Sequence, residues 1–166
     1  MLRHTKAKDI DSILEIYKKA SESLKTDGVD QWQNEGPNKS SLVKDMEMEY
    51  SYVLEENGEI KGTAAIIFDG EKTYDLIFNG NWLNEEEYCT IHRFAVNVNY
   101  RQEGNAGKML KEIEGICLSK GVYNIRIDTH EDNFKMRNFL EKNGFLECGR
   151  IFLRNGDLRV AYQKIL

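Results

Sequence analysis

The segment from residue 88 to residue 121 most constrains how this chain can fold. It runs from the β-branched and aromatic stretch YCTIHRFAV, through the loop RQEGNAG, into a long stretch whose apolar residues recur at helical spacing. Gly121 is placed to end that helix, and YNIRIDTH after it reads as another strand. A connection that contains a whole helix is what joins parallel strands, so we expect one parallel step between the Tyr88 and Tyr123 strands.

The sequence before this segment predicts two helices and an antiparallel meander. Apolar residues recur at helical spacing over residues 10–24, with Asp9 as the N-cap, and again over residues 41–48. Asn57-Gly58 lies between two strand-like runs and is a strong hairpin signal, and KTYDLIF (residues 72–78) is expected to form a third strand.

The sequence after the segment predicts a helix and a closing hairpin. Asn133 should cap a helix over residues 134–143, which Gly144 should end, and residues 154–157 should turn the final hairpin. The expected fold class is α/β (α+β), with a mixed, mostly antiparallel sheet and one central parallel strand pair.

Composition and charge limit the class of protein. A chain of 166 residues has the size of one domain, so we expect residues 1–166 to form a single domain. A net charge of −5 argues against a general nucleic-acid binder, because such proteins carry a basic field. The longest apolar stretch, AAIIF, is far shorter than the roughly 20 residues of a membrane span. We expect a cytoplasmic protein with reduced cysteines that binds neither nucleic acid nor membrane.

No metal site is predicted. Cys89 and His92 have the spacing of metal ligands, but no second pair of ligands accompanies them.

The loop between the strand and the helix has the features of a phosphate-binding turn. A nucleotide P-loop needs Gly and Ser or Thr where this chain has Gln102 and Met109, and no placement supplies the glycines of a dinucleotide fingerprint. Arg-x-x-Gly-x-Ala, formed by Arg101, Gly104 and Ala106, does fit. The first amides of a helix lack partners within it, and the helix dipole attracts anions, so this loop favours a pyrophosphate. Taken alone, it could equally be a tight turn that binds nothing.

The loop and the second half of the chain together resemble the GNAT superfamily, the Gcn5-related N-acetyltransferases. RQEGNAG, a helix, IRIDTHEDN and FLEKNGF follow one another as in that family, and the diagnostic residues lie between about Thr90 and Phe145. The resemblance implies transfer of an acetyl group from acetyl-CoA, by direct attack, to a primary amine of a small molecule or protein. It also implies a β-bulge that splays the parallel strands and lets pantetheine lie between them. The implied cofactor-binding residues are Phe94, Ala95 and Val96 through their backbone, Arg101, Gln102, Gly104, Asn105, Ala106, Gly107 and Lys108 in the loop, and Asn133, Phe139 and Lys142.

The same resemblance suggests the catalytic groups. An ammonium with a pKa of ~10.4 is mostly protonated at neutral pH, so a group must accept its proton. His92, two residues before Phe94, is the candidate general base, although a histidine packed in the sheet is the alternative. Leu140 stands where the family has its general-acid tyrosine, so the general acid is unassigned.

The acceptor side is less constrained. Trp32, Tyr74 and Trp82 could line a substrate pocket, and Asp128 and His130 could hold a water chain, although core or structural roles are commoner for such residues. Two rival hypotheses remain, a non-catalytic acyl-CoA sensor, motivated by the leucine at the acid position, and a phosphate-binding regulatory domain without CoA. A homodimer is compatible with the sequence.

Overall fold

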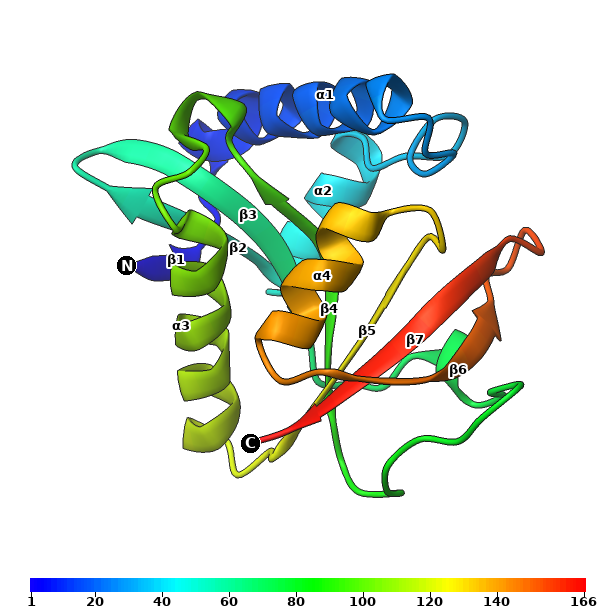
Figure 1. Cartoon of the computed structure of the whole chain (residues 1–166). Coiled ribbons are helices and arrows are strands. Elements are labelled where there is room, and N and C mark those ends of the chain that lie inside the picture. The colour runs from blue at the N-terminus through cyan, green and yellow to red at the C-terminus, as the bar shows by residue number, and fades with distance from the viewer. The chain divides into compact units, whose positions relative to one another are not determined.

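The computed structural model describes residues 1–166, and its seven strands form one sheet in the order β1-β2-β3-β4-β5-β7-β6 (Figure 1). Strands β4 and β5 pair in parallel at Cys89↔Ile125 and Thr90↔Arg126, whereas β5–β7 and β6–β7 are antiparallel, as are β1–β2 and β2–β3. This is the mixed, mostly antiparallel sheet that the sequence predicts. The strands are β1 (Leu2–His4), β2 (Ser51–Glu56), β3 (Glu59–Ile67), β4 (Cys89–Val96), β5 (Asn124–Thr129), β6 (Leu146–Phe152) and β7 (Leu158–Ile165). The helices are α1 (Ile10–Thr26), α2 (Lys39–Glu47), α3 (Asn105–Ser119) and α4 (Phe134–Lys142), with short 3₁₀ helices η1 (Ala7–Asp9), η2 (Lys72–Tyr74) and η3 (Val98–Tyr100).

The chain divides into two compact units. The first unit contains Met1–Ile66 and His92–Gly115, and the second contains Ile67–Ile91 and Ile116–Leu166. The chain passes between the units inside two regular elements, because β4 begins in the second unit and ends in the first, and α3 does the reverse.

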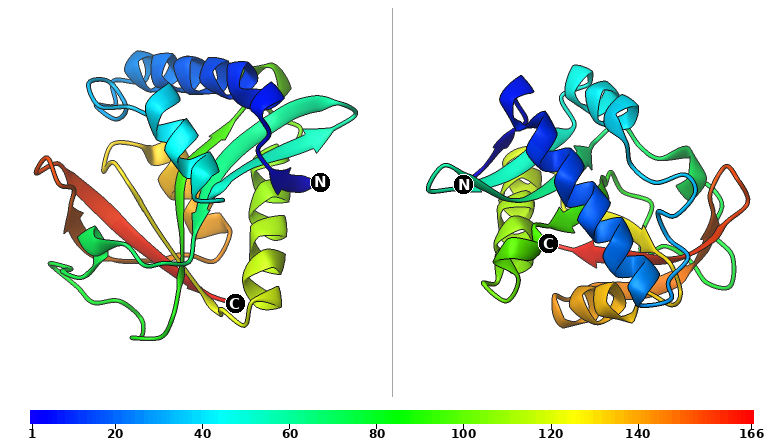
Figure 2. Two further views of the ribbon diagram at one scale, coloured as in Figure 1. Left: turned by 180° about the vertical axis from the view of Figure 1, so that it is seen from behind. Right: turned by 90° about the horizontal axis from the view of Figure 1, so that it is seen from above.

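In the first unit, helices α1 and α2 pack on one face of β2 and β3 (Figure 2). Their shared core contains Ile13, Tyr17, Leu42 and Val53. Helix α3 packs against Gly62 on β3, where a Cβ would overlap the sulfur of Met109 and lie 2.9 Å from the carbonyl oxygen of Ala95. A glycine at position 62 therefore permits the close approach of α3.

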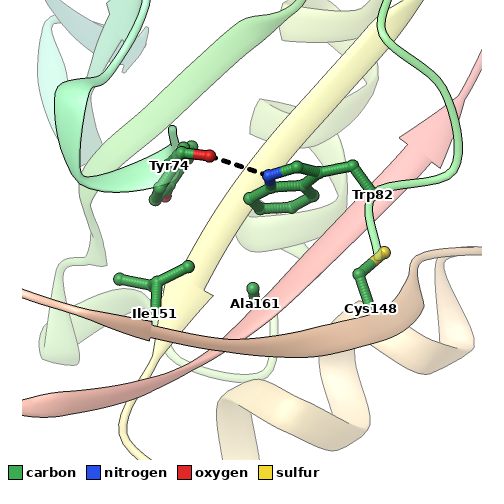
Figure 3. Close-up of a cluster of buried hydrophobic side chains, with 5 residues drawn as sticks. All are labelled: Tyr74, Trp82, Cys148, Ile151 and Ala161. Carbon is green, nitrogen blue, oxygen red and sulfur yellow. Dashed lines mark hydrogen bonds between the residues drawn. The ribbon is translucent and has the colours of Figure 1, made fainter. Parts of the chain in front are cut away.

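In the second unit, a buried cluster joins the β6–β7 hairpin to the loop that precedes β4 (Figure 3). The cluster contains Tyr74, Trp82, Cys148, Ile151 and Ala161. The indole N–H of Trp82 donates to the carbonyl oxygen of Tyr74 at 2.9 Å, so the polar end of this buried side chain is satisfied within the cluster.

The prediction of a strand over residues 72–78 is wrong. Residues 72–74 form η2, and only an isolated bridge links Phe78 to Arg150 on β6. The Glu71 carboxylate accepts hydrogen bonds from the backbone N–H of Thr73 at 3.1 Å and from its hydroxyl at 2.9 Å. This local capping favours a tight turn, and it outweighs the strand propensity of the segment.

The ends of two predicted helices also differ from the prediction. Asp9 makes no side-chain cap of α1, because its carboxylate accepts instead from the Lys6 N–H at 2.8 Å and from the Arg3 guanidinium at 2.7 and 3.0 Å. Helix α2 begins at Lys39 rather than at residue 41, because Asn38 caps it by accepting from the Ser41 N–H at 3.0 Å.

None of the helices has the length and apolar character needed to span a membrane.

Candidate active site

The loop that leads into α3 leaves the start of that helix open. Gln102 and Gly104 are both left-handed, with φ values of 68° and 73°. The first backbone hydrogen bond of the helix runs from the Lys108 N–H to the Gly104 carbonyl oxygen at 3.0 Å. The N–H groups of Asn105, Ala106 and Gly107 therefore have no acceptor within the helix.

Neither the backbone conformation nor a close contact within the chain requires a glycine at position 107. Its φ is not positive, and a Cβ added there would meet no heavy atom within 4 Å. Glycine in the first turn also costs the helix up to about 1 kcal/mol relative to alanine. A Cβ at Gly104 would meet no heavy atom within 4 Å either. This open space beside unsatisfied amides suits the close approach of an anionic ligand.

Asn105, the first residue of α3, is buried and only partly satisfied. Its Nδ2 donates to the Tyr100 carbonyl oxygen at 3.0 Å and to Glu103 Oε2 at 3.3 Å. Its Oδ1 is buried without a partner, which is costly for a polar atom. Because Oδ1 is an acceptor, it suits an N–H or O–H donor or an ordered water rather than a phosphate.

The two cations of the loop have partners of their own. Arg101 Nη2 donates to Ser23 Oγ at 3.0 Å, and Lys108 Nζ lies 3.1 Å from both carboxylate oxygens of Glu56. Both contacts are exposed. Exposed ion pairs contribute about 0–1 kcal/mol, so exchanging Glu56 for a phosphate would cost Lys108 little.

Strand β4 carries the candidate base beside a distorted residue. Arg93 adopts a left-handed φ of 52° between His92 and Phe94, both of which are half-buried. A left-handed residue inside a strand is typical of a β-bulge, so we call this feature the Arg93 bulge. The resemblance implied a bulge in this sheet, but the sequence did not identify the residue that forms it.

An ion pair that sequence reasoning missed lies at the bulge. Arg93 donates through Nε to Asp45 Oδ2 at 2.7 Å and through Nη2 to Asp45 Oδ1 at 2.8 Å. Burial raises the pKa of the Asp45 carboxyl above its ordinary value, and the charges of Arg93 and His92 oppose that shift. The partners are 48 residues apart, and no local pattern in the sequence connects them.

The candidate acceptor-side residues lie in both units, with Asp128, His130, Tyr74 and Trp82 in the second unit and Trp32 in the first. Asp128 Oδ2 accepts a 2.7 Å hydrogen bond from Tyr74, and His130 Nδ1 accepts from the Asp132 N–H at 3.1 Å. Trp82 belongs to the buried cluster. Trp32 is half-buried in the first unit and packs against the core of α1 and α2.

The α4 residues of the candidate site differ in exposure. Asn133 caps α4, as predicted, by accepting from the Met136 N–H at 3.2 Å. Phe139 is half-buried and Lys142 is exposed. Leu140 is 1% exposed, so it is a core residue of the second unit.

Comparison with known proteins identifies the family. The model of the acetyltransferase (GNAT) family matches residues 10–145. No protein of curated function matches the sequence. A GNAT-family acetyltransferase from Streptococcus agalactiae shares 34% identity, with a TM-score of 0.90 over 100% of this chain and 95% of that one.

Two more distant structures share the fold. One is the ribosomal-protein-alanine N-acetyltransferase of Brucella melitensis, with 19% identity and a TM-score of 0.70 over 100% of this chain and 99% of that one. The other is the PaiA N-acetyltransferase of Thermoplasma acidophilum in complex with coenzyme A, with 16% identity and a TM-score of 0.73 over 100% of this chain and 98% of that one. The family match over most of the sequence carries the assignment. The chain belongs to the acetyltransferase (GNAT) family and is an N-acetyltransferase.

Proposed function

We propose that this protein transfers an acetyl group from acetyl-CoA to a primary amine, with residues 1–166 acting as one acetyltransferase domain. The observation that carries the proposal is the open start of α3. Three amides there lack helical partners, and Gly107 has no structural reason within the chain. The site fits a pyrophosphate because backbone amides and the helix dipole both favour an anion.

In this proposal the chain holds acetyl-CoA through backbone groups. Residues 104–108 bind the pyrophosphate, with Arg101, Gln102 and Lys108 near it, and the main chain of Phe94, Ala95 and Val96 bonds the pantetheine. A backbone N–H of this strand polarises the thioester carbonyl. Acetyl-CoA supplies an activated acyl group when bound. The family resemblance assigns Asn133, Phe139 and Lys142 to the same ligand.

His92 is the proposed general base. It accepts a proton from the acceptor amine, whose nitrogen then forms a C–N bond to the carbonyl carbon while the C–S bond breaks. CoA leaves as a thiolate, which is a tolerable leaving group because a thiol pKa is ~8.5. Since Leu140 offers no proton, the thiolate takes its proton from water, or it takes the proton that the acceptor amine loses. Slower turnover is the expected consequence.

The acceptor is proposed to be a small-molecule or protein amine. The fold serves protein acceptors elsewhere, since one structural neighbour is named as a ribosomal-protein-alanine N-acetyltransferase. Trp32, Trp82, Asp128 and His130 are the proposed acceptor-side residues. We place the reaction in the cytoplasm, in keeping with three buried cysteines that form no disulfide.

The buried Leu140 favours one second candidate, a non-catalytic acyl-CoA sensor. An amine-library screen that follows the release of free CoA thiol separates the two functions, with an acceptor-free reaction as the control for hydrolysis. Catalysis predicts amine-dependent thiol release that rises with pH as the acceptor deprotonates. A protein that binds CoA tightly but shows no amine-dependent release is a sensor.

A further inference from the structure

We propose that Asp45 of α2 is a positioning residue for acetyl transfer, because it holds Arg93 in its left-handed conformation and thereby maintains the Arg93 bulge. This inference rests on the proposed function, in which β4 carries His92 and the backbone that binds acetyl-CoA.

The conformation of Arg93 needs an external support. A φ of 52° is unfavourable for any residue with a Cβ, because the Cβ approaches the carbonyl oxygen. Such residues persist only where their surroundings hold them, and they cluster at functional sites. Arg93 itself is not one of the residue types that favour the left-handed conformation, which are Gly, Asn, Asp and His.

Asp45 supplies that support with two directed hydrogen bonds. The guanidinium contacts both carboxylate oxygens, at 2.7 and 2.8 Å, a bidentate geometry that fixes orientation as well as distance. The side chains of Asp45 and Arg93 are 9% and 24% exposed, so water competes weakly for either partner. Loss of one partner would leave the other charge poorly solvated.

Asp45 is itself held firmly in place. Asn38 caps the start of α2, and Leu42, one turn before Asp45, is fully buried in the core with α1 and Val53. The backbone carbonyl of Asp45 also accepts from the Tyr50 N–H at 2.8 Å. The carboxylate therefore projects from a rigid helix rather than from a mobile loop.

The bulge sets the direction of every residue that follows it on β4. Successive side chains alternate between the two faces of a strand, so one residue of altered conformation changes which face each later residue meets. Ala95, two residues after Arg93, is buried and its carbonyl lies at the close approach to Gly62. Relaxation of Arg93 to an extended conformation would turn the backbone of Phe94–Val96 relative to His92.

Three variants test this role. Asp45→Asn and Arg93→Ala remove the ion pair but leave a Cβ at position 93. Arg93→Gly removes the pair and also the Cβ that makes the left-handed conformation unfavourable. The matched control is Arg3, which also donates to a buried aspartate, Asp9, but has no left-handed φ. At position 3, on strand β1, glycine should lower the stability of the protein more than alanine does.

We expect Asp45→Asn and Arg93→Ala to lower kcat by roughly 10- to 100-fold, as misplacement of reacting groups does. CoA affinity by calorimetry should fall less than kcat, because residues 104–108 still bind the pyrophosphate. Arg93→Gly should recover at least about fivefold over Arg93→Ala, because glycine adopts the bulge without support. The melting temperature of Arg93→Gly should exceed that of Arg93→Ala, with the reverse order for Arg3→Gly and Arg3→Ala.

Equal turnover in Arg93→Gly and Arg93→Ala would overturn the inference, and so would a lower melting temperature for Arg93→Gly. The melting comparison tests the strained conformation of Arg93 even if the wild-type protein releases no thiol, a result that would refute the proposed function instead.

Discussion

The phenolic hydroxyl of Tyr74 donates a hydrogen bond of 2.7 Å to Oδ2 of Asp128, 54 residues further along the chain. Tyr74 is 1% exposed, and its ring lies 5.2 Å from that of Trp82, measured between centroids. Burial and the neighbouring Asp128 carboxylate raise the pKa of Tyr74 well above its ordinary value of 10.0. The bond links η2 to β5, and it fixes one oxygen of the Asp128 carboxylate.

Tyr74→Phe should destabilise the protein while it keeps the ring packing. The variant removes a hydrogen bond to a charged group, whose loss typically costs about 1.5–3 kcal/mol, and urea unfolding at pH 7 measures the change. Tyr123→Phe is the control, because Tyr123 is exposed. Equal losses of stability in the two variants would contradict a special role for the Tyr74–Asp128 bond.

Tyr17→Phe should flatten the loss of stability at alkaline pH. Burial raises the pKa of Tyr17 to about 12, whereas an unfolded phenol titrates near ~10. Between these values the unfolded chain binds fewer protons than the folded one, so stability falls as pH rises. The contribution of this group is fully present below pH ~10 and declines by about 1.4 kcal/mol per pH unit above it. Denaturant unfolding from pH 8 to 12 tests this. Phenylalanine at the exposed Tyr123 serves as the control, and the same pH slope in Tyr17→Phe and wild type would refute the prediction.

Gly104→Asp should abolish stabilisation by CoA, because it adds a side chain and a negative charge at the open start of α3. In the wild-type protein, CoA at ~100 times its Kd should stabilise the fold by roughly 2.7 kcal/mol, seen as a raised melting temperature. Gly28→Asp is a matched control, since Gly28 has the same φ of 73° and equally open surroundings at the end of α1. Each shift is measured against the same variant without CoA. An undiminished shift in Gly104→Asp would remove the loop from the cofactor site.

His92→Ala should lower turnover by roughly 100-fold with nearly unchanged CoA affinity, as expected for loss of a general base. Turnover against pH with a saturating amine, together with calorimetry of CoA binding, measures both effects. His4→Ala on β1 is the control for a histidine outside the site. A wild-type pH profile in His92→Ala would exclude His92 as the base and favour water held by Asp128 or His130.

Interactions between neighbouring residues allowed much of the secondary structure to be predicted from the sequence. Asn57 and Gly58 take φ values of 55° and 80°, as a two-residue hairpin turn requires, and Asn133 caps α4 through an amide three residues away. The start of α3 was predicted for the same reason. In each case the residues that decide the backbone conformation are neighbours in the chain, so the pattern contains the physical cause.

Contacts between distant segments decided the rest. The segment 72–78 has strand-forming composition. Capping by Glu71 favours a turn at its start, and Tyr74 is held in the core with Trp82 and residues of β6 and β7, so most of the segment forms no strand. Asp9 has the position of an N-cap, but Arg3 takes its carboxylate. The left-handed Arg93 depends on Asp45, 48 residues earlier in the chain. A charge or a hydrogen-bonding group in the sequence does not specify its partner. Only folding brings the two together, in a buried place where a polar group without a partner would be costly.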